Sequence, residues 1–327
     1  MISRIAEPSQ VAEARRAAVA LAQAGGLDAT GTGRVALVVT EMATNLLKHA
    51  GGGDMIVQRI ADADGDCLEV LALDGGPGIG DAGRALEDGY SSAGSPGTGL
   101  GAIRRQADRF DLWSRAGFGT AVMARFVLGG GARCTAKLGA VMVPYPGETA
   151  IGDGWACHAS PTGPRLFVCD GSGHGPEAAK ATQAALRAFE QHPGLESARL
   201  AELIHRQLTP TRGAAIALAQ VDASHGLVRF VGIGNISGAL VSHGQLRRMV
   251  SHNGIAGHVA ARIREFTYPF VGEVMLILHS DGLSAKWALD TYPGLAASHP
   301  SIIAGVLFRL HGRQRDDACV VVLRVTS

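Results

Sequence analysis

The sequence predicts an α+β protein built from two domains. Its 327 residues, 46% hydrophobic and 18% charged, are enough for two cores of ordinary domain size. Helix-like and strand-like runs alternate over residues 1–128, whereas residues 136–327 are dominated by apolar strand-like runs with a few long helices. Residues 129–135, "GGGARCT", are rich in glycine and lack a hydrophobic period, which predicts a linker between the domains.

The first domain is expected to be an α/β sandwich. Helices are predicted at residues 11–23 and 33–50, because each ends at glycine, and a third near residues 101–107. Apolar runs rich in β-formers predict strands at "MIVQRI", "CLEVLALD", "RFDLWS" and "TAVMARFVL".

The second domain is expected to be rich in strands. The predicted strands are "LGAVMVPY", "RLFVCD", "AAIALAQVD", "LVRFVGIGN", "GALVSHG", "VMLILHS" and "ACVVVLRV". Helices are predicted at residues 176–191, 200–208 and 301–311.

Composition excludes several classes of protein. A formal charge of +1 without any Lys/Arg run argues against nucleic-acid binding, which needs a concentrated basic surface. Five scattered cysteines without CxxC spacing suggest neither a disulfide framework nor a zinc site, so we expect a reducing cytoplasm. No apolar run approaches the roughly 20 residues needed to cross a bilayer, and we expect no membrane partner.

A first group of polar residues lies in the N-terminal half. Glu41 and Asn45 are four residues apart, so they share one face of the helix predicted at residues 33–50. Asp74 ends an apolar strand and opens "DGGPGIG", where glycines allow backbone to approach a flat ligand. The second glycine run, "GTGLG" at residues 97–101, directly precedes a helix, whose free N–H groups and dipole favour phosphate.

These three motifs, in this order, resemble the Bergerat-type ATP site of the GHKL superfamily. Residues 11–128 look most like the anti-sigma-factor serine/threonine kinases of the RsbT type. The resemblance implies that ATP binds with Mg²⁺ held by Asn45 and that Glu41 is the general base for a Ser or Thr hydroxyl. It further implies an adenine contact from Asp74, a pocket lined by Gly76 and Gly78, and phosphate contacts from Gly97, Thr98, Gly99, Leu100 and Gly101. The chain departs from the family pattern in its short lid and in having Ser95 and Pro96, instead of arginine, before Gly97.

A second group of acidic residues recurs at strand ends in the C-terminal half. The sites are "IGDG" with Asp153, "VCDGSGHG" with Asp170, "HSDG" with Asp281, and "RDDA" with Asp316 and Asp317. An Asp-Gly at the end of a strand places a carboxylate beside an accessible backbone carbonyl. Several such ends together would make an all-oxygen site suited to Mg²⁺ or Mn²⁺.

This order of motifs resembles the PPM-type metal-dependent Ser/Thr phosphatases, particularly their SpoIIE/RsbX branch, over residues 136–327. The resemblance implies an αββα sandwich with two Mn²⁺ or Mg²⁺ ions. Asp170 would bridge both ions and act in catalysis, and Gly171 would offer its carbonyl oxygen. Asp153, Asp281 and Asp316 would complete the metal shells, with Asp317 a weaker candidate.

The leading interpretation is a bifunctional partner-switching regulator. Its two halves would add phosphate to, and remove it from, Ser/Thr of a STAS-domain protein, such as a stressosome or sigma-factor regulator. In the alternative, only the phosphatase turns over and the first domain senses ATP or docks a partner, because the arginine expected before Gly97 is missing. Less favoured alternatives are a scaffold in which both sites have decayed and a topoisomerase or repair ATPase.

Overall fold

The structure is a computed structural model that describes residues 1–86, 99–129, 136–160, 162–260, 263–313 and 315–326. The chain divides into two compact units. Unit 1 comprises Met1–Ala132 and Tyr292–Arg309, and unit 2 comprises Arg133–Thr291 and Leu310–Ser327. Residues 292–309, which lie within the sequence range expected for the second domain, cluster with unit 1.

Among the described residues of unit 1, five strands form one antiparallel sheet in the order β1-β2-β3-β5-β4. The strands are β1 (Ile2–Ile5), β2 (Gly53–Asp62), β3 (Gly65–Leu73), β4 (Arg109–Arg115) and β5 (Gly119–Val127). The helices are α1 (Pro8–Ala24), α2 (Ala29–Ala50), α3 (Ala82–Ala85), α4 (Gly99–Gln106), the 3₁₀ turn η2 (Leu295–Ala297) and α7 (Pro300–His311), whose last two residues fall in unit 2.

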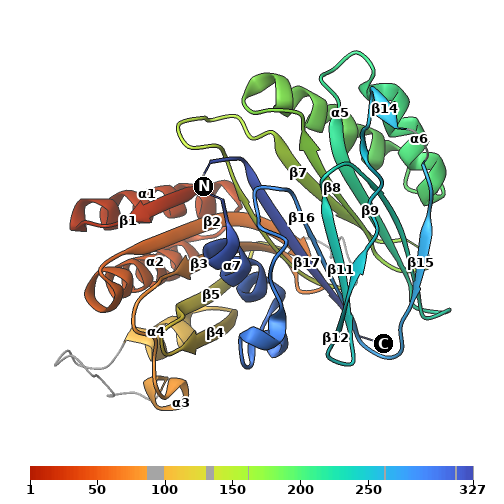
Figure 1. Cartoon of the computed structure of the whole chain (residues 1–327). Helices are drawn as coiled ribbons and strands as arrows, with labels where there is room; N and C mark the ends of the chain where they lie inside the picture. The colour runs from red at the N-terminus through yellow and green to blue at the C-terminus, as the bar shows by residue number, and fades with distance from the viewer. Residues whose placement is uncertain (87–98, 130–135, 161, 261–262, 314, 327) are drawn as a thin grey trace. The chain divides into compact units, whose positions relative to one another are not determined.

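Helices α1 and α2 cover one face of this sheet (Figure 1). Helix α2 begins four residues earlier than predicted, because the side chain of Asp28 accepts a hydrogen bond from the Gly31 amide (2.7 Å) and caps it. It ends at Gly51, whose φ of 68° favours glycine. The apolar stripe of α2, including Val38 and Met42, is buried against the sheet.

Helix α7 covers other residues of the same sheet. Its side chains Ile302, Ile303, Val306 and Leu307 are fully buried. A Cβ added at Gly305 would lie 2.7 Å from Leu73 Cδ2 and 2.9 Å from Leu71 Cδ2, so the helix backbone lies directly on strand β3. Leu71 and Leu73 alternate along β3 with Leu68, Val70 and Ala72, which pack with α1 and α2.

A buried ion network lies beneath α7. Arg125 of β5 donates to Glu69 Oε2 (2.7 Å) and Asp62 Oδ2 (2.7 Å), and all three side chains are fully buried. Ser301 of α7 donates to Glu69 Oε2 (2.5 Å) and accepts from Arg125 Nη2 (3.0 Å). Burial alone would lower the pKa of Arg125, but the charges of Glu69 and Asp62 outweigh burial and raise it. Helix α7 therefore contributes, through Ser301, to the hydrogen bonding of the buried Arg125 and Glu69 side chains of the sheet.

Unit 2 contains, in the part that the structure describes, two antiparallel five-stranded sheets. Their strand orders are β15-β10-β9-β8-β7 and β12-β11-β16-β17-β6. The strands are β6 (Lys137–Val143), β7 (Asp153–His158), β8 (Arg165–Gly171), β9 (Ala214–Asp222), β10 (Leu227–Ile233), β11 (Ser237–Ser242), β12 (Gln245–Met249), β13 (Gly254–Ile255), β14 (Val259–Ala260), β15 (Phe266–Pro269), β16 (Val274–His279) and β17 (Ala318–Val325). The helices are α5 (Pro176–Gln191), α6 (Ser197–Leu208) and the 3₁₀ turn η1 (Leu289–Thr291).

Helices α5 and α6 pack on the sheet that contains β8 and β9 (Figure 1). Their contact with it is apolar and includes Phe167 and Phe189, whose rings stack at 5.1 Å. Strand β17 of the other sheet contacts β7 and β8, so the two sheets form a sandwich. None of the described helices in either unit is long and apolar enough to cross a bilayer.

The buried ion network gives a prediction about stability. Replacing Arg125 with Met leaves two buried carboxylates without their cation, so the free energy of unfolding should fall by about 3–5 kcal/mol. The matched control is Arg59→Met, which removes an ion pair to Asp66 from an arginine that is 62% exposed and should cost far less than the change at Arg125. Urea denaturation followed by circular dichroism measures both values, and equal losses would contradict the structural role of the network.

Candidate functional site

In unit 1 the structure brings the predicted catalytic helix and the second glycine run together. Glu41 and Asn45 are both half-buried on α2, beside its apolar stripe. A Cβ added at Gly99, the first residue of α4, would lie 3.5 Å from the Asn45 amide and 3.6 Å from Glu41 Oε2. The N-terminal end of α4 therefore lies against the two polar side chains. This arrangement fits the expected roles, in which the helix end binds phosphate beside Asn45 as a metal ligand and Glu41 as a base.

Asp74 lies at a tight turn that follows β3. Its Oδ1 accepts hydrogen bonds from the amides of Gly76 (2.8 Å) and Thr120 (3.1 Å). Burial raises the pKa of the Asp74 carboxyl even though these two amides favour its ionised form. A partly desolvated carboxylate that is fixed by backbone amides is well suited to accept a hydrogen bond from an exocyclic amine.

The glycines after Asp74 are required by close approach of neighbouring backbone. A Cβ at Gly76 would lie 2.8 Å from that of Ala50, and one at Gly78 would lie 2.3 Å from the carbonyl oxygen of Arg115. Gly78 also has a φ of 79°, which disfavours other residues. Leu100 and the buried Gly101 belong to α4, whereas Gly97 and Thr98 lie outside the described residues.

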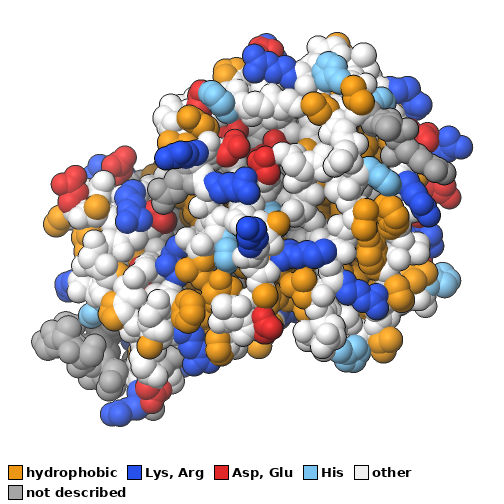
Figure 2. Space-filling model, viewed as in Figure 1, with side chains coloured by type: hydrophobic (Ala, Val, Ile, Leu, Met, Phe, Trp, Pro, Cys, Tyr) orange, Lys and Arg blue, Asp and Glu red, His pale blue; other side chains and the backbone are white. Residues whose placement is uncertain are grey.

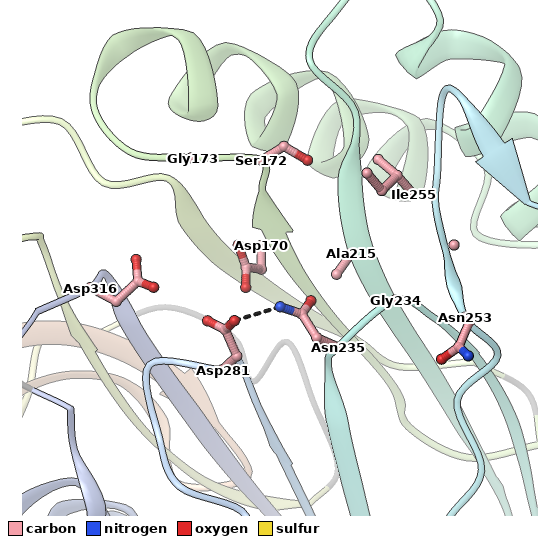
Figure 3. A pocket seen from close by; sticks show the side chains of 11 residues that line it. Asp170, Ser172, Gly173, Ala215, Gly234, Asn235, Asn253, Ile255, Asp281 and Asp316 are labelled. Carbon is pink, nitrogen blue, oxygen red and sulfur yellow. Dashed lines mark hydrogen bonds between the residues drawn. The ribbon is translucent and has the colours of Figure 1, made fainter.

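In unit 2, predicted metal ligands line a cavity of about 460 Å³. Figure 3 shows the carboxylates of Asp170, Asp281 and Asp316 arranged around a common space, with Asn235 donating to Asp281 Oδ2 (2.5 Å). In Figure 2 acidic side chains gather on the face of unit 2 that is turned to the viewer. The cavity is lined by Asp170, Ser172, Gly173, Ala215, Gly234, Asn235, Asn253, Gly254, Ile255, Asp281 and Asp316.

Strand pairing explains why these acids meet. Strand β16 ends two residues before Asp281, and its antiparallel neighbour β17 begins two residues after Asp316. A Cβ at Gly282 would lie 2.0 Å from the carbonyl oxygen of Asp317, so only glycine lets the two turns approach this closely. In the other sheet, Asp170 near the end of β8 is directly opposite Asp153 at the start of β7.

The electrostatics of the cavity favour a cation. Burial raises the pKa of Asp170 to about 7, and the like charges of Asp281 and Asp316 add to the shift. Burial and the charge of Asp316 also raise the pKa of Asp281. Carboxylates this crowded repel each other when ionised, and a hard divalent ion relieves that repulsion. The donor set therefore fits Mg²⁺ or Mn²⁺.

Three other predicted positions have packing or hydrogen-bonding roles. Asp153 is 3% exposed and accepts a hydrogen bond from Ser280 Oγ (2.6 Å), and burial together with the charge of Asp170 raises its pKa well above the usual range. Asp317 accepts from the amides of Tyr145 (2.7 Å) and Gly152 (3.0 Å), which fastens the chain between β6 and β7. Gly171 lies under α5, where a Cβ would be 2.3 Å from the carbonyl oxygen of Ala178, and it does not line the cavity.

The carboxylates of the cavity are spread more widely than the ligands of a single-ion cage. Within the described ranges, one group of three acidic or histidine side chains has candidate ligand atoms that all lie within 4.8 Å of each other. That group, Asp62, Asp64 and His299, lies in unit 1, and Asp62 in it is already paired with Arg125. It is therefore separate from both predicted sites.

Comparison with known proteins assigns both halves. The family model "Stage II sporulation protein E (SpoIIE)" matches residues 160–326, just over half of the chain. The chain belongs to the SpoIIE family. The model "Histidine kinase-like ATPase domain" matches residues 5–126, ahead of the SpoIIE region. The predicted combination of an RsbT-like kinase domain with a SpoIIE-like PPM phosphatase domain is thereby confirmed, and with it the fold class and the assignment of the chain as an enzyme.

Individual relatives agree with this assignment of the SpoIIE-family chain. The serine/threonine-protein kinase RsbT of Bacillus subtilis (strain 168) is 34% identical over 121 residues, which are 37% of this chain and 91% of RsbT. A structure described under "The bacterial stressosome: a modular system that has been adapted to control secondary messenger signaling" is 28% identical, with a TM-score of 0.54 over 57% of this chain and 98% of its own. RsbX in complex with magnesium shares the fold at 17% identity, with a TM-score of 0.50 over 57% of this chain and 94% of its own.

Two residues of the SpoIIE-family cavity were missed by sequence reasoning. Asn235 orients the Asp281 carboxylate, and Asn253 lines the same cavity. Asn235 follows the strand "LVRFVGI" after a single glycine, so it lies two residues after the end of β10, as Asp281 lies two residues after the end of β16. Restricting the search to carboxylates overlooked it.

The raised pKa of Asp170 gives a prediction about pH. The folded metal-free protein keeps the Asp170 proton up to about pH 7, whereas the unfolded chain loses it near pH 4, so stability should fall as the pH rises through this window. Asp170→Asn should therefore be more stable than the wild type at pH 8 in chelator, by about 2 kcal/mol, with little difference at pH 4.

Urea denaturation at the two pH values tests this expectation. Asp290→Asn, a change at an exposed position of unit 2, should keep the wild-type profile. Mn²⁺ at pH 8 should stabilise the wild type more than Asp170→Asn. Identical pH profiles for the wild type and Asp170→Asn would contradict the raised pKa of the Asp170 carboxyl.

Proposed function

We propose that this chain is a bifunctional partner-switching regulator. It would use ATP to phosphorylate, and a two-metal site to dephosphorylate, Ser or Thr of a STAS-domain protein of the stressosome or anti-sigma-antagonist type. The observation that carries the proposal is the convergence of Asp170, Asp281 and Asp316 on one cavity in a SpoIIE-family domain. The RsbT relative and the stressosome structure support this choice of partner class.

In the phosphatase half, the side chains of the cavity hold and orient the reactants. Asp170, Asp281 and Asp316 would be the ion ligands, and Asn235 keeps the Asp281 carboxylate turned toward the cavity. Two divalent ions, when bound, supply a nucleophilic hydroxide at neutral pH and neutralise the charge of the phosphoester. Asp153 and Asp317 would support the site through hydrogen bonds. Asp153 accepts from Ser280, and Asp317 holds the backbone before β7.

In the kinase half, the roles follow from positions on α2 and α4. Glu41 would take the proton of the attacking hydroxyl, and Asn45, one turn further along the helix, would hold Mg²⁺ with ATP. The N-terminal end of α4 at Gly99 would receive the phosphates, since it lies against both side chains. Asp74 would accept a hydrogen bond from the adenine amine.

The second candidate function keeps only the phosphatase activity. Ser95 and Pro96 stand where kinases of this type carry an arginine before the second glycine run, so the γ-phosphate lacks that cation. Unit 1 would then sense nucleotide or dock a partner without transferring phosphate. Transfer of label from γ-labelled ATP to STAS-domain proteins, in the presence of Mg²⁺, separates this version from the bifunctional one.

The phosphatase assignment predicts the behaviour of Asp170→Ala. Removal of this carboxylate should lower Mn²⁺-dependent hydrolysis of p-nitrophenyl phosphate by about 100-fold or more, because the ions would lose one of their carboxylate ligands. The control Asp290→Ala, at an exposed position of the same unit, should hydrolyse the ester at the wild-type rate. Hydrolysis by Asp170→Ala at that rate would remove Asp170 from the metal site.

The kinase assignment predicts the behaviour of Glu41→Gln. The amide keeps the shape of the side chain but cannot accept the proton, so phosphoryl transfer should fall by about 100-fold or more while ATP affinity stays within about twofold. Glu13→Gln, an exposed position on α1, is the matched control. Transfer by Glu41→Gln at the wild-type rate would exclude Glu41 as the base.

A further inference from the structure

Arg212 is a cationic residue of unit 2 that has no role in the metal site described above. It lies in the turn between α6 and β9, and its side chain is exposed. A Cβ added at Gly173, which lines the metal cavity, would lie 3.4 Å from Arg212 Nη1. The guanidinium therefore lies against the backbone at the rim of the cavity.

The turn that carries Arg212 is fixed by hydrogen bonds. Thr211 Oγ1 accepts from the Gly213 amide (3.0 Å), and the carbonyl oxygen of Gly213 accepts from the amide of Ser172 (3.0 Å), which also lines the cavity. A Cβ at Gly213 would lie 2.6 Å from the carbonyl oxygen of Ala256, and its φ of 75° also favours glycine. The backbone of Arg212 is thus held beside the cavity.

The charge of Arg212 is not neutralised by a neighbour. Within the part of the chain that the structure describes, no carboxylate forms an ion pair with its guanidinium. Two acidic residues beside the Gly173 turn have other partners, since Glu177 pairs with Lys180 (2.5 Å) and Glu148 pairs with His174 (3.3 Å). Arg212 is therefore available to bind an anion that enters the cavity.

The charges of the cavity call for one further cation when a phosphate ester is bound. Asp170, Asp281 and Asp316 carry three negative charges when ionised, and the two divalent ions of the proposed site would carry four positive charges. A phosphomonoester dianion adds two negative charges, which leaves one net negative charge. None of the described residues that line the cavity is a lysine or an arginine. Arg212, at the rim, would supply the balancing charge.

The position of Arg212 also bears on the kind of ester that fits. Ser172 and Gly173 lie across the cavity from Asp281 and Asp316 (Figure 3). A phosphoryl group among the acids would therefore turn an outer oxygen toward Arg212. In a monoester this oxygen is charged and can accept a guanidinium hydrogen bond. In a diester a second carbon group replaces one charged oxygen, so the ester offers the guanidinium less charge and fewer acceptors.

We propose that Arg212 is a specificity-determining residue that binds the phosphoryl group of the substrate and makes the unit 2 site prefer phosphomonoester dianions to phosphodiesters. The proposal rests on the proposed phosphatase function, because it names the residue that holds the substrate at that site. Every residue that it involves belongs to unit 2.

The first test compares a monoester with a diester at pH 8 and saturating Mn²⁺. In Arg212→Ala, KM for p-nitrophenyl phosphate should rise by about tenfold or more, because a hydrogen bond to a charged oxygen is lost, while kcat stays within about threefold. For bis-p-nitrophenyl phosphate, kcat/KM should change by less than about twofold. Where hydrolysis of the diester is slow, its inhibition constant against the monoester gives the same comparison.

The second test measures binding without turnover. Calorimetric titration of the Mg²⁺-loaded protein with inorganic phosphate should show an affinity about tenfold lower in Arg212→Ala than in the wild type. Asp170→Ala measures phosphate binding elsewhere in the molecule, which is subtracted. Arg212→Lys keeps the charge but not the planar donors and should lose less affinity than Arg212→Ala. The control Arg187→Ala removes the same charge from an exposed position on α5 and should behave as the wild type.

The outcomes separate the role of Arg212 from the function on which it rests. Wild-type KM and phosphate affinity in Arg212→Ala would overturn the proposal. Equal losses with both esters, a loss confined to kcat, or a changed half-saturating Mn²⁺ concentration would also overturn it, because the turn would then support the site only structurally. All these results leave the phosphatase assignment standing, whereas a wild type without Mn²⁺-dependent hydrolysis would refute that assignment and the proposal with it.

Discussion

The mutual repulsion of four neighbouring carboxylates, one of them buried and three half-buried, is the constraint that the architecture of unit 2 has to satisfy. Asp153 and Asp170 face each other across β7 and β8, and Asp281 and Asp316 are brought together at the paired ends of β16 and β17. Each sheet contributes two acids, and hydrogen bonds from Ser280 and Asn235 fix two of the carboxylates. Holding like charges close together lowers the stability of the fold, and clusters of perturbed ionisable groups of this kind are typical of functional sites.

Much of this fold could be predicted from the sequence. The order of the acids after apolar strands and of the glycine runs indicated both folds through its resemblance to known families. The structure shows that glycines such as Gly282 and Gly78 are required where backbone approaches backbone. Local patterns also indicated α2, although its capping residue Asp28 lengthens it at the N-terminus. These features depend on neighbours in sequence or on steric rules that every chain obeys.

Other features could not be predicted, because they depend on partners distant in sequence. Nothing local to residues 292–309 shows that they pack on β3 and β5, since a buried apolar helix reads the same whichever sheet it covers. The pairing of Arg125 with Glu69 and Asp62 depends on the register between strands β3 and β5, which the sequence does not fix.

The passage of the chain through unit 1 between β16 and β17 limits how this protein can be divided. A cut within the glycine-rich stretch after β5 would leave an N-terminal fragment without helix α7, which covers Leu71, Leu73 and the buried ion network. In the C-terminal fragment, the apolar side chains of α7 would lack the sheet on which they pack. Residues 1–132 would then be separated from a segment that packs with them, so the boundary between the two units is not a single point along the chain.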